Sequence, residues 1–139
     1  MGQTSKTFSI VLVEDNPADV LLVTKALQAK GLNCALTSFE SGEKALKNLS
    51  QKGRLSPDLI LLDLNLPGAD GVDVLGKILA IPRLSEVPVA ILTSSESPSD
   101  MQRTARIGAA RYIRKPSALE DFYREVGCGV EEMLLRNET

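Results

Sequence analysis

The sequence has no histidine, only two cysteines and no long hydrophobic segment. Without histidine the chain offers no His metal ligand, no His general base and no phosphohistidine, so any chemistry must use carboxylates, hydroxyls and lysines. Cys34 and Cys128 lie far apart, which favours unpaired thiols in a reducing compartment over a disulfide or a metal site. No apolar segment reaches the roughly 20 residues that cross a bilayer, and residues 1–7 lack the apolar core of a signal peptide. We therefore expect a cytoplasmic protein that does not contact membranes.

A strong net charge is also absent, since 16 basic and 18 acidic residues give a formal charge of -2. No block of basic residues is available to replace the counterions of a phosphate backbone, and we expect no nucleic-acid binding. A length of 139 residues, with 43% hydrophobic and 24% charged residues, is typical of one globular domain. We predict a flexible segment at residues 1–7 and one domain at residues 8–139.

Short apolar segments alternate along the chain with segments that have helix caps and helical periodicity. The predicted strands are residues 8–13, 33–39, 59–62, 87–92 and 111–114. The predicted helices run from Pro17 to about Lys30, from Ser41 to near Lys52-Gly53, from Asp70 to Pro82, from Ser97 to Gly108, and onward from Ser117. Five strands that alternate with five helices indicate right-handed βαβ units, and hence a doubly wound α/β fold with one parallel sheet covered on both faces.

The most informative residue is Asp63, which follows the apolar run 59–62 directly. Four consecutive apolar residues before a turn are typical of a strand buried on both faces. A carboxylate at the carboxyl end of such a strand faces the crevice in which open α/β sheets bind ligands. In isolation Asp63 could equally cap the turn before Pro67-Gly68, so the ends of the other strands decide between these interpretations.

Chemically active side chains also follow three other predicted strands. Glu14 and Asp15 follow the first, Thr93 the fourth and Lys115 the fifth. Crowded carboxylates repel one another and are stabilised by a cation, and an all-oxygen ligand set favours Mg²⁺. A lysine and a hydroxyl beside the metal would hold the oxygens of a phosphoryl group, and Asp63 would be the nucleophile. Taken singly, the same residues could be a helix N-terminal acid pair, a strand-end hydroxyl and a surface charge.

The combination of motifs resembles the receiver domain of two-component response regulators. The resemblance covers essentially the whole chain, and it implies a flavodoxin-like fold with strand order 2-1-3-4-5. The motifs that carry it are Val13-Glu14-Asp15-Asn16, Leu62-Asp63-Leu64-Asn65-Leu66-Pro67-Gly68, Asp70-Gly71, Leu92-Thr93-Ser94 and Lys115-Pro116.

The resemblance also implies roles for single residues. Asp63 would accept a phosphoryl group from the phosphohistidine of a sensor histidine kinase. Asp15, Asp63 and the backbone carbonyl of Asn65 would bind Mg²⁺, with Glu14 acting largely through a coordinated water. The protein would then be a signalling domain that promotes its own phosphorylation and dephosphorylation, and not an enzyme in the usual sense.

On the phosphate side of the site, the resemblance implies that Thr93 and Lys115 hold the phosphoryl oxygens. Tyr112 matches the aromatic residue that follows the threonine inward on phosphorylation; alone, it could be a half-buried aromatic at the sheet edge. The Lys115-Pro116 peptide bond is expected to be cis, an isomer essentially restricted to proline.

Two segments, residues 51–57 and 81–89, are similar to those of the small regulators that pair with bacterial phytochromes. A phytochrome-type kinase is therefore the expected input. The signal would leave through a changed protein-interaction surface and reach an unknown downstream protein. A phosphorelay intermediate or a phosphate sink is an alternative with the same chemistry.

Three other functional classes are less compatible with the sequence. A haloacid-dehalogenase-type phosphatase needs its nucleophile on the first strand with a second acid two residues on, where this chain has Asn65 after Asp63. A flavin-binding electron carrier needs a phosphate loop after the first strand, where Glu14 and Asp15 would repel phosphate. A pseudo-receiver that only binds partners would not need the acids and Lys115.

Two further features suggest contact surfaces. Gly127-Cys128-Gly129 interrupts the last helix, and two glycines there indicate either a bend or the close approach of another backbone. A homodimer formed by the fourth helix, fifth strand and fifth helix would supply such an approach. In the first helix, residues 20–23 are all apolar and cannot all face the sheet. We expect Val20 and Leu21 to be exposed, where neighbouring loops could cover them or the kinase could dock.

Overall fold

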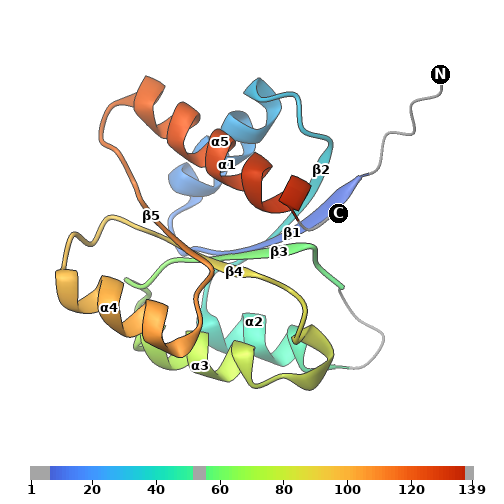
Figure 1. Cartoon of the computed structure of the whole chain (residues 1–139), viewed down its shortest axis with the longest axis vertical. Helices are drawn as coiled ribbons and strands as arrows, with labels where there is room; N and C mark the ends of the chain where they lie inside the picture. The colour runs from blue at the N-terminus through green and yellow to red at the C-terminus, as the bar shows by residue number, and fades with distance from the viewer. Residues whose placement is uncertain (1–6, 52–55, 137–139) are drawn as a thin grey trace.

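The computed structural model describes residues 7–51 and 56–136 and contains one five-stranded parallel sheet. The strand order is β2-β1-β3-β4-β5, as predicted. Most of the predicted segment at residues 1–7 lies outside the described residues. The strands are β1 (Phe8–Val13), β2 (Cys34–Phe39), β3 (Leu59–Leu62), β4 (Val89–Thr93) and β5 (Arg111–Arg114) (Figure 1).

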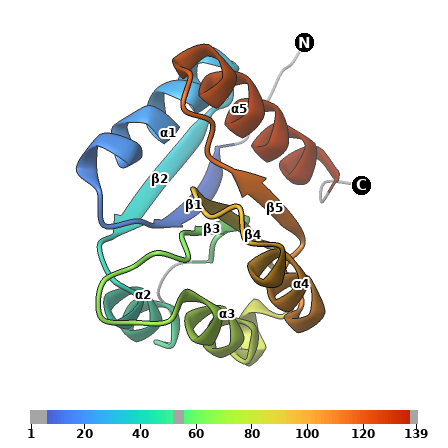
Figure 2. The same cartoon turned by 90° about the vertical axis from the view of Figure 1, so that its left-hand side faces the viewer.

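Helices cover both faces of this sheet, as a doubly wound fold requires. Helices α1 and α5 lie together on one face, and α2, α3 and α4 lie on the other (Figures 1 and 2). The described helices are α1 (Pro17–Ala29), α2 (Gly42–Leu49), α3 (Gly71–Leu79), the short 3₁₀ helix η1 (Pro82–Leu84), α4 (Pro98–Ile107) and α5 (Leu119–Arg136).

The sheet divides the hydrophobic core into two clusters. Successive side chains of a strand point to opposite faces, so Leu59 and Leu61 pack under α1 and α5, whereas Ile60 and Leu62 pack against α2 and α3. All four side chains of β3 are fully buried. This confirms the prediction that β3 is a central strand, and it places Asp63 at the point where the chain leaves the core.

Local chemistry sets the ends of the elements. The Asn16 side chain accepts a hydrogen bond from the Ala18 amide at 2.9 Å, and Pro17 takes the first helical position of α1. Helix α2 ends at Leu49, earlier than predicted, and Lys52 and Gly53 lie outside the described residues. Strand β4 begins at Val89 and not at Val87, because the Val87 amide donates to the Leu84 carbonyl and closes the turn after η1.

The two glycines of α5 are explained by contacts within the chain. Helix α5 is continuous, and a Cβ on Gly127 would lie 3.3 Å from the backbone carbonyl oxygen of Ala26 in α1. A Cβ on Gly129 would lie 2.9 Å from Cδ1 of Ile113 in β5. The predicted close approach of another backbone is therefore confirmed at Gly127, where α1 of the same chain makes it, and Gly129 instead packs against the Ile113 side chain. These glycines give no support to a homodimer.

The prediction of a cis Lys115-Pro116 bond is wrong. Among the described residues every peptide bond is trans, including this one. The trans form is the more stable isomer of an X-Pro bond by about 0.5–1 kcal/mol, and with it Lys115 already reaches the acids at the end of the sheet.

Within residues 7–51 and 56–136, none of the helices has the length and apolar character needed to cross a membrane.

Candidate functional site

The predicted site residues meet at one edge of the sheet because they all follow the carboxyl ends of parallel strands. Glu14 and Asp15 follow β1, Asp63 follows β3, Thr93 ends β4 and Lys115 follows β5. Figure 2 is viewed toward this edge, where the strands lead into the loops before the helices. A haloacid-dehalogenase-type phosphatase needs its nucleophile on the first strand. The position of Asp63 after β3 therefore argues against that class.

Three of these side chains form an acidic cluster. Carboxylate oxygens of Glu14, Asp15 and Asp63 all lie within 4.8 Å of one another, close enough to share one metal ion. Glu14 and Asp63 are 3% and 4% exposed, whereas Asp15 faces solvent. Oxygen-only ligands favour a hard divalent cation, so the residues fit the predicted metal. The backbone carbonyl of Asn65 stays a predicted ligand. The backbone amide of Asn65 donates a hydrogen bond to Oδ1 of Asp63 at 3.0 Å.

Lys115 supplies the positive charge of the cluster. Its Nζ lies 2.6 Å from Oε1 of Glu14 and 3.3 Å from Oδ2 of Asp63, and only 10% of its side chain is exposed. Burial favours the neutral form of Glu14 and raises its pKa to about 7, although the contact with Lys115 opposes this shift. Burial lowers the pKa of Lys115, but its carboxylate partners outweigh burial and raise it. Lys115 therefore carries its positive charge at neutral pH.

Sequence reasoning missed one participant, Asp19. An acid in the first turn of α1 needs no explanation beyond a favourable helix N-terminus, yet Oδ2 of Asp19 lies 2.8 Å from Nζ of Lys115. The two residues are separated by 96 positions in the sequence. None of the motifs links Asp19 to Lys115. The one available signal was the short connection from β1 to α1, which places the first turn of α1 near the carboxyl ends of the strands.

Thr93 is fully buried, and two neighbouring groups hydrogen-bond its hydroxyl. The side-chain amide of Asn65 donates to Oγ1 of Thr93 at 3.2 Å, and the Ser95 amide donates to the same oxygen at 3.3 Å. The loop after β3 is thus connected directly to the end of β4. A change at Asp63 could reach Thr93 through Asn65, only two residues away.

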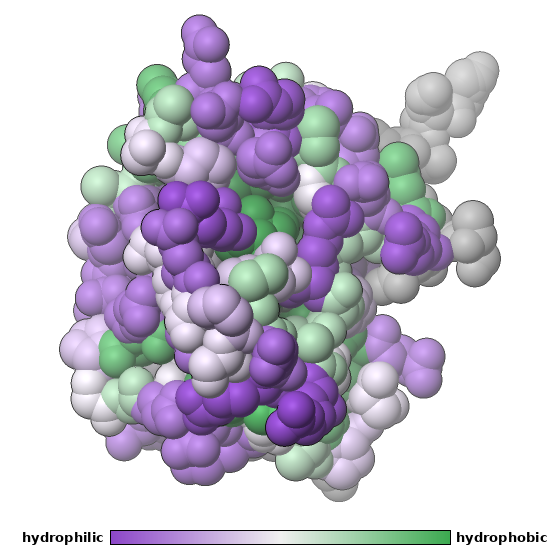
Figure 3. Space-filling view, turned by 60° about the vertical axis from the view of Figure 1, so that its left-hand side comes forward, coloured by the Kyte–Doolittle hydropathy of each residue, from purple (hydrophilic) through white to green (hydrophobic). Residues whose placement is uncertain are grey.

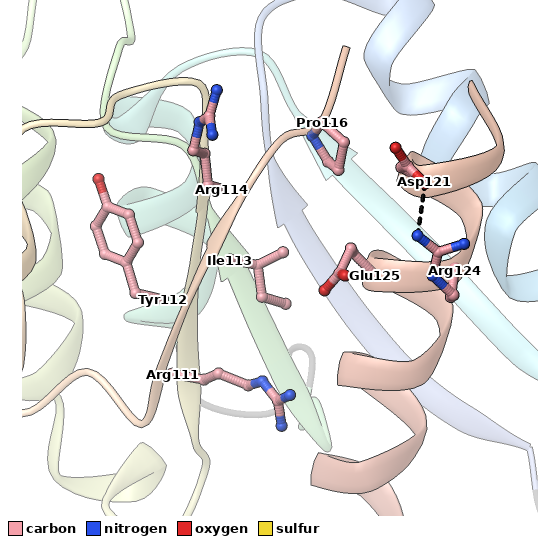
Figure 4. A pocket seen from close by; sticks show the side chains of 8 residues that line it. All are labelled: Arg111, Tyr112, Ile113, Arg114, Pro116, Asp121, Arg124 and Glu125. Atoms are coloured by element: carbon pink, nitrogen blue, oxygen red, sulfur yellow. Dashed lines mark hydrogen bonds and ion pairs between the residues drawn. The ribbon is translucent and has the colours of Figure 1, made fainter. Parts of the chain in front are cut away.

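Tyr112 lies on the side of β5 that faces away from α5. Figure 4 shows its ring directed away from α5, whereas Ile113 points toward that helix. The Tyr112 hydroxyl donates to the backbone carbonyl of Ser95 at 3.0 Å, and the Ser95 hydroxyl donates to Asp100 in the first turn of α4 at 2.7 Å. Thr93, Ser95 and Tyr112 are therefore joined by hydrogen bonds at the start of α4.

The loop between Asp63 and α3 is fixed by a close backbone contact at Gly71. A Cβ at this position would overlap the backbone of Leu64, closer to its Cα than real Cβ atoms come. Asp70 caps α3 by accepting a hydrogen bond from the Val72 amide at 3.0 Å. The Asp70-Gly71 motif therefore holds the residue after Asp63 in place.

The predicted docking pair on α1 is only half correct. Leu21 is 54% exposed, but Val20 is half-buried and packs against the core cluster under α1 and α5. Val23 is fully buried, whereas Leu22 is only partly buried. Figure 3, turned toward the site, shows mostly hydrophilic side chains with small separate hydrophobic patches. The exposed apolar feature of α1 is thus a single leucine.

Comparison with known proteins agrees with this geometry. Residues 10–126 match the family described as response regulator receiver domain. The response regulator Rcp1 of Synechocystis sp. is 36% identical over 134 residues, which are 94% of this chain and 90% of that protein. A probable methanogenesis regulatory protein, FilR2, of Methanothrix harundinacea is 38% identical over 86% of this chain and 79% of that protein.

A solved structure gives the same result in three dimensions. The phosphorylated cyanobacterial phytochrome response regulator RcpA superposes with a TM-score of 0.85 at 36% identity, covering 96% of this chain and 98% of that one. A Mn²⁺-bound form of Rcp1 superposes with a TM-score of 0.81, at 36% identity over 90% of this chain and 92% of that one. With the family match spanning most of the sequence and the acids, threonine and lysine brought together as that family requires, this chain belongs to the response regulator receiver family of two-component signalling.

Proposed function

We propose that Asp63 accepts a phosphoryl group from the phosphohistidine of a sensor histidine kinase. The Oδ oxygen of Asp63 forms the new bond to phosphorus while the bond from phosphorus to the histidine nitrogen breaks, so no further reactant is needed. Lys115 and Thr93 then hold the phosphoryl oxygens, whose charge is spread over three atoms. Hydrolysis by water returns Asp63 to its free form.

The observation that carries this proposal is the placement of Lys115 beside the acids. Its Nζ is 3.3 Å from Oδ2 of Asp63, while Glu14 and Asp15 supply two further carboxylates within 4.8 Å. An acid held between a fixed cation and a metal-binding cluster is arranged to stabilise added negative charge. A helix-capping role alone would not require this buried constellation.

Mg²⁺ is the cofactor that fits the proposal. Glu14, Asp15 and Asp63 would hold it, together with the predicted carbonyl of Asn65. When bound, the ion neutralises the carboxylates and the negative oxygens of the incoming phosphoryl group. The Mn²⁺-bound Rcp1 structure supports a divalent ion in this fold, and the preference for Mg²⁺ belongs to the proposal.

The input we infer is a phytochrome-type histidine kinase. Rcp1 and RcpA resemble this chain over nearly its whole length, and RcpA is described as a phytochrome response regulator. Docking of the kinase would use Leu21, which is exposed on the helix that begins beside the site. An apolar anchor there would help to bring histidine and Asp63 into reacting geometry.

The output we infer is a changed surface on α4, β5 and α5. Thr93 would turn toward the phosphoryl group, and Tyr112 would follow it inward and release the Ser95 carbonyl. Met101 and Ile107 expose apolar surface on α4, which suits contact with a downstream protein or with a second copy of this chain. On the other side of β5, a pocket of about 390 Å³ opens toward α5. Figure 4 shows side chains that line it, among them Ile113 of β5 and Glu125 of α5.

Beryllofluoride tests the proposal, because it mimics a phosphoryl group on a carboxylate. We expect it to bind in Mg²⁺ but not in EDTA, as measured by fluorine NMR. Asp63→Asn should not bind beryllofluoride. Lys115→Ala should bind it weakly, and its Tyr112 side chain should not move inward. Equal binding by the wild type and Asp63→Asn would refute the assignment.

A further inference from the structure

Lys115 has three carboxylate partners, which is as many as an ammonium group has N–H donors. Nζ lies 2.6 Å from Glu14, 2.8 Å from Asp19 and 3.3 Å from Asp63. Two of these partners belong to the acidic cluster that could hold a metal ion, whereas Asp19 does not. Asp19 comes from the first turn of α1 and is 23% exposed, so it approaches the lysine from the solvent side.

We propose that Asp19 is a positioning residue for Lys115, which holds the ammonium partly away from Asp63 and so keeps that carboxylate available to the cation. This inference rests on the proposed function, since it concerns the same site. It assigns a role to Asp19, a residue that lies outside all the motifs of the sequence analysis.

The physical reason is competition for the same oxygens. Lys115 and Mg²⁺ are both cations, and both need Glu14 and Asp63. Nζ of Lys115 lies 2.8 Å from Oδ2 of Asp19 but 3.3 Å from Oδ2 of Asp63, so the contact with Asp19 is the shorter of the two. Ion pairs between largely buried groups are screened far less than those at the surface. If Asp19 is removed, the freed donor turns to the remaining carboxylates, and Mg²⁺ must displace a more tightly held lysine.

An ordinary explanation of Asp19 is that an acid in the first turn stabilises a helix N-terminus. The chain offers a matched control for that effect in Asp73, which occupies the third position after its cap in α3, as Asp19 does in α1. Asp73 is exposed, and within residues 7–51 and 56–136 it forms no ion pair. Asp73→Asn therefore reproduces the loss of the helix charge without touching Lys115.

The test is a double-mutant cycle on Mg²⁺ affinity, measured by isothermal titration calorimetry in the full chain. Asp19→Asn is made in the parent protein and in Lys115→Met. We expect it to raise the Kd for Mg²⁺ at least threefold in the parent and less than twofold in Lys115→Met. Asp73→Asn should leave the Kd unchanged. Circular dichroism melts of Asp19→Asn and Asp73→Asn should be alike, which shows that both variants fold.

A fixed negative charge would contribute equally in both backgrounds, because interactions between fixed point charges add. An equal change in Kd with and without Lys115, a larger change without it, or no change in either would therefore overturn the role of Asp19. Asp63→Asn separates this result from a failure of the proposed function. If the parent and Asp63→Asn bind Mg²⁺ equally well, the metal site itself is wrong; if only the parent binds, the cycle decides on Asp19 alone.

Discussion

The ammonium of Lys115 donates a 2.6 Å hydrogen bond to Glu14 across 101 residues of sequence. The bond joins the end of β5 to the end of β1, and both side chains are largely removed from solvent. Glu14 thus has two tasks, since it balances the lysine and belongs to the acidic cluster. The interpretation of Glu14 as a residue that acts through a metal-bound water described only one of them.

Burial of Glu14 predicts how stability depends on pH in the absence of metal. The pKa of Glu14 is about 7 in the folded protein and 4.5 in an exposed chain. Between these values the folded state holds a proton that the unfolded chain has lost, so raising the pH disfavours folding. We expect the free energy of unfolding in EDTA to fall from about pH 5 to pH 7 and to level off above.

Glu14→Gln provides the control, because glutamine does not ionise. The difference between the two stability curves, measured by urea unfolding at several pH values, isolates Glu14 from the other titrating groups. Identical slopes for the wild type and Glu14→Gln would contradict the assignment of this pH dependence to Glu14.

Gly71→Ala should destabilise the protein and disturb the loop that carries Asp63. The new Cβ would overlap the backbone of Leu64, so the loop must shift. Overpacking of this kind costs about 1–3 kcal/mol. Gly76→Ala is the matched control in the same helix, because a Cβ there has no neighbour within 4 Å. It should stabilise α3 by about 0.5–1 kcal/mol. Urea unfolding of both variants checks that the free energy of unfolding falls in Gly71→Ala and rises in Gly76→Ala. If Gly76→Ala lowers it as much as Gly71→Ala does, the contact with Leu64 is not the cause of the destabilisation.

Leu21→Arg should slow phosphotransfer from the cognate kinase at least tenfold and leave labelling by acetyl phosphate nearly unchanged. Acetyl phosphate needs the site but no docking surface, so the two rates separate positioning from chemistry. Leu135→Arg is the control, since Leu135 is 51% exposed but lies in the last turn of α5, which ends at the other edge of the sheet. A parallel loss of both reactions in Leu21→Arg, or no loss in either, would show that Leu21 is not a docking residue.

The helices and strands could be predicted from the sequence because periodicity and caps are local signals, whereas the strand order came from the resemblance to receiver domains. Strand β3 was recognised from four consecutive apolar residues, and Asp63 followed from its place after them. The other site residues could be predicted for the same reason, since each follows the end of a strand and parallel strands end at one edge. The parallel topology therefore allowed one common site to be predicted from separate local patterns.

Contacts that depend on the packing of helices could not be predicted in this way. Asp19 reaches Lys115 only because α1 folds back over the sheet, and no spacing in the sequence links them. The glycine at position 127 correctly indicated a close backbone approach, but only the structure shows that α1 of the same chain makes it. Val20 was expected to be exposed, and its packing against the core depends on the rotation of α1 about its axis.

The most direct test of the account is to label the protein with acetyl phosphate and map the modified residue by peptide mass spectrometry. The account predicts one phosphoryl group on Asp63 when Mg²⁺ is present, none in EDTA and none in Asp63→Asn. Labelling of Asp63→Asn to the same extent as the wild type, or labelling that is unchanged by EDTA, would contradict it.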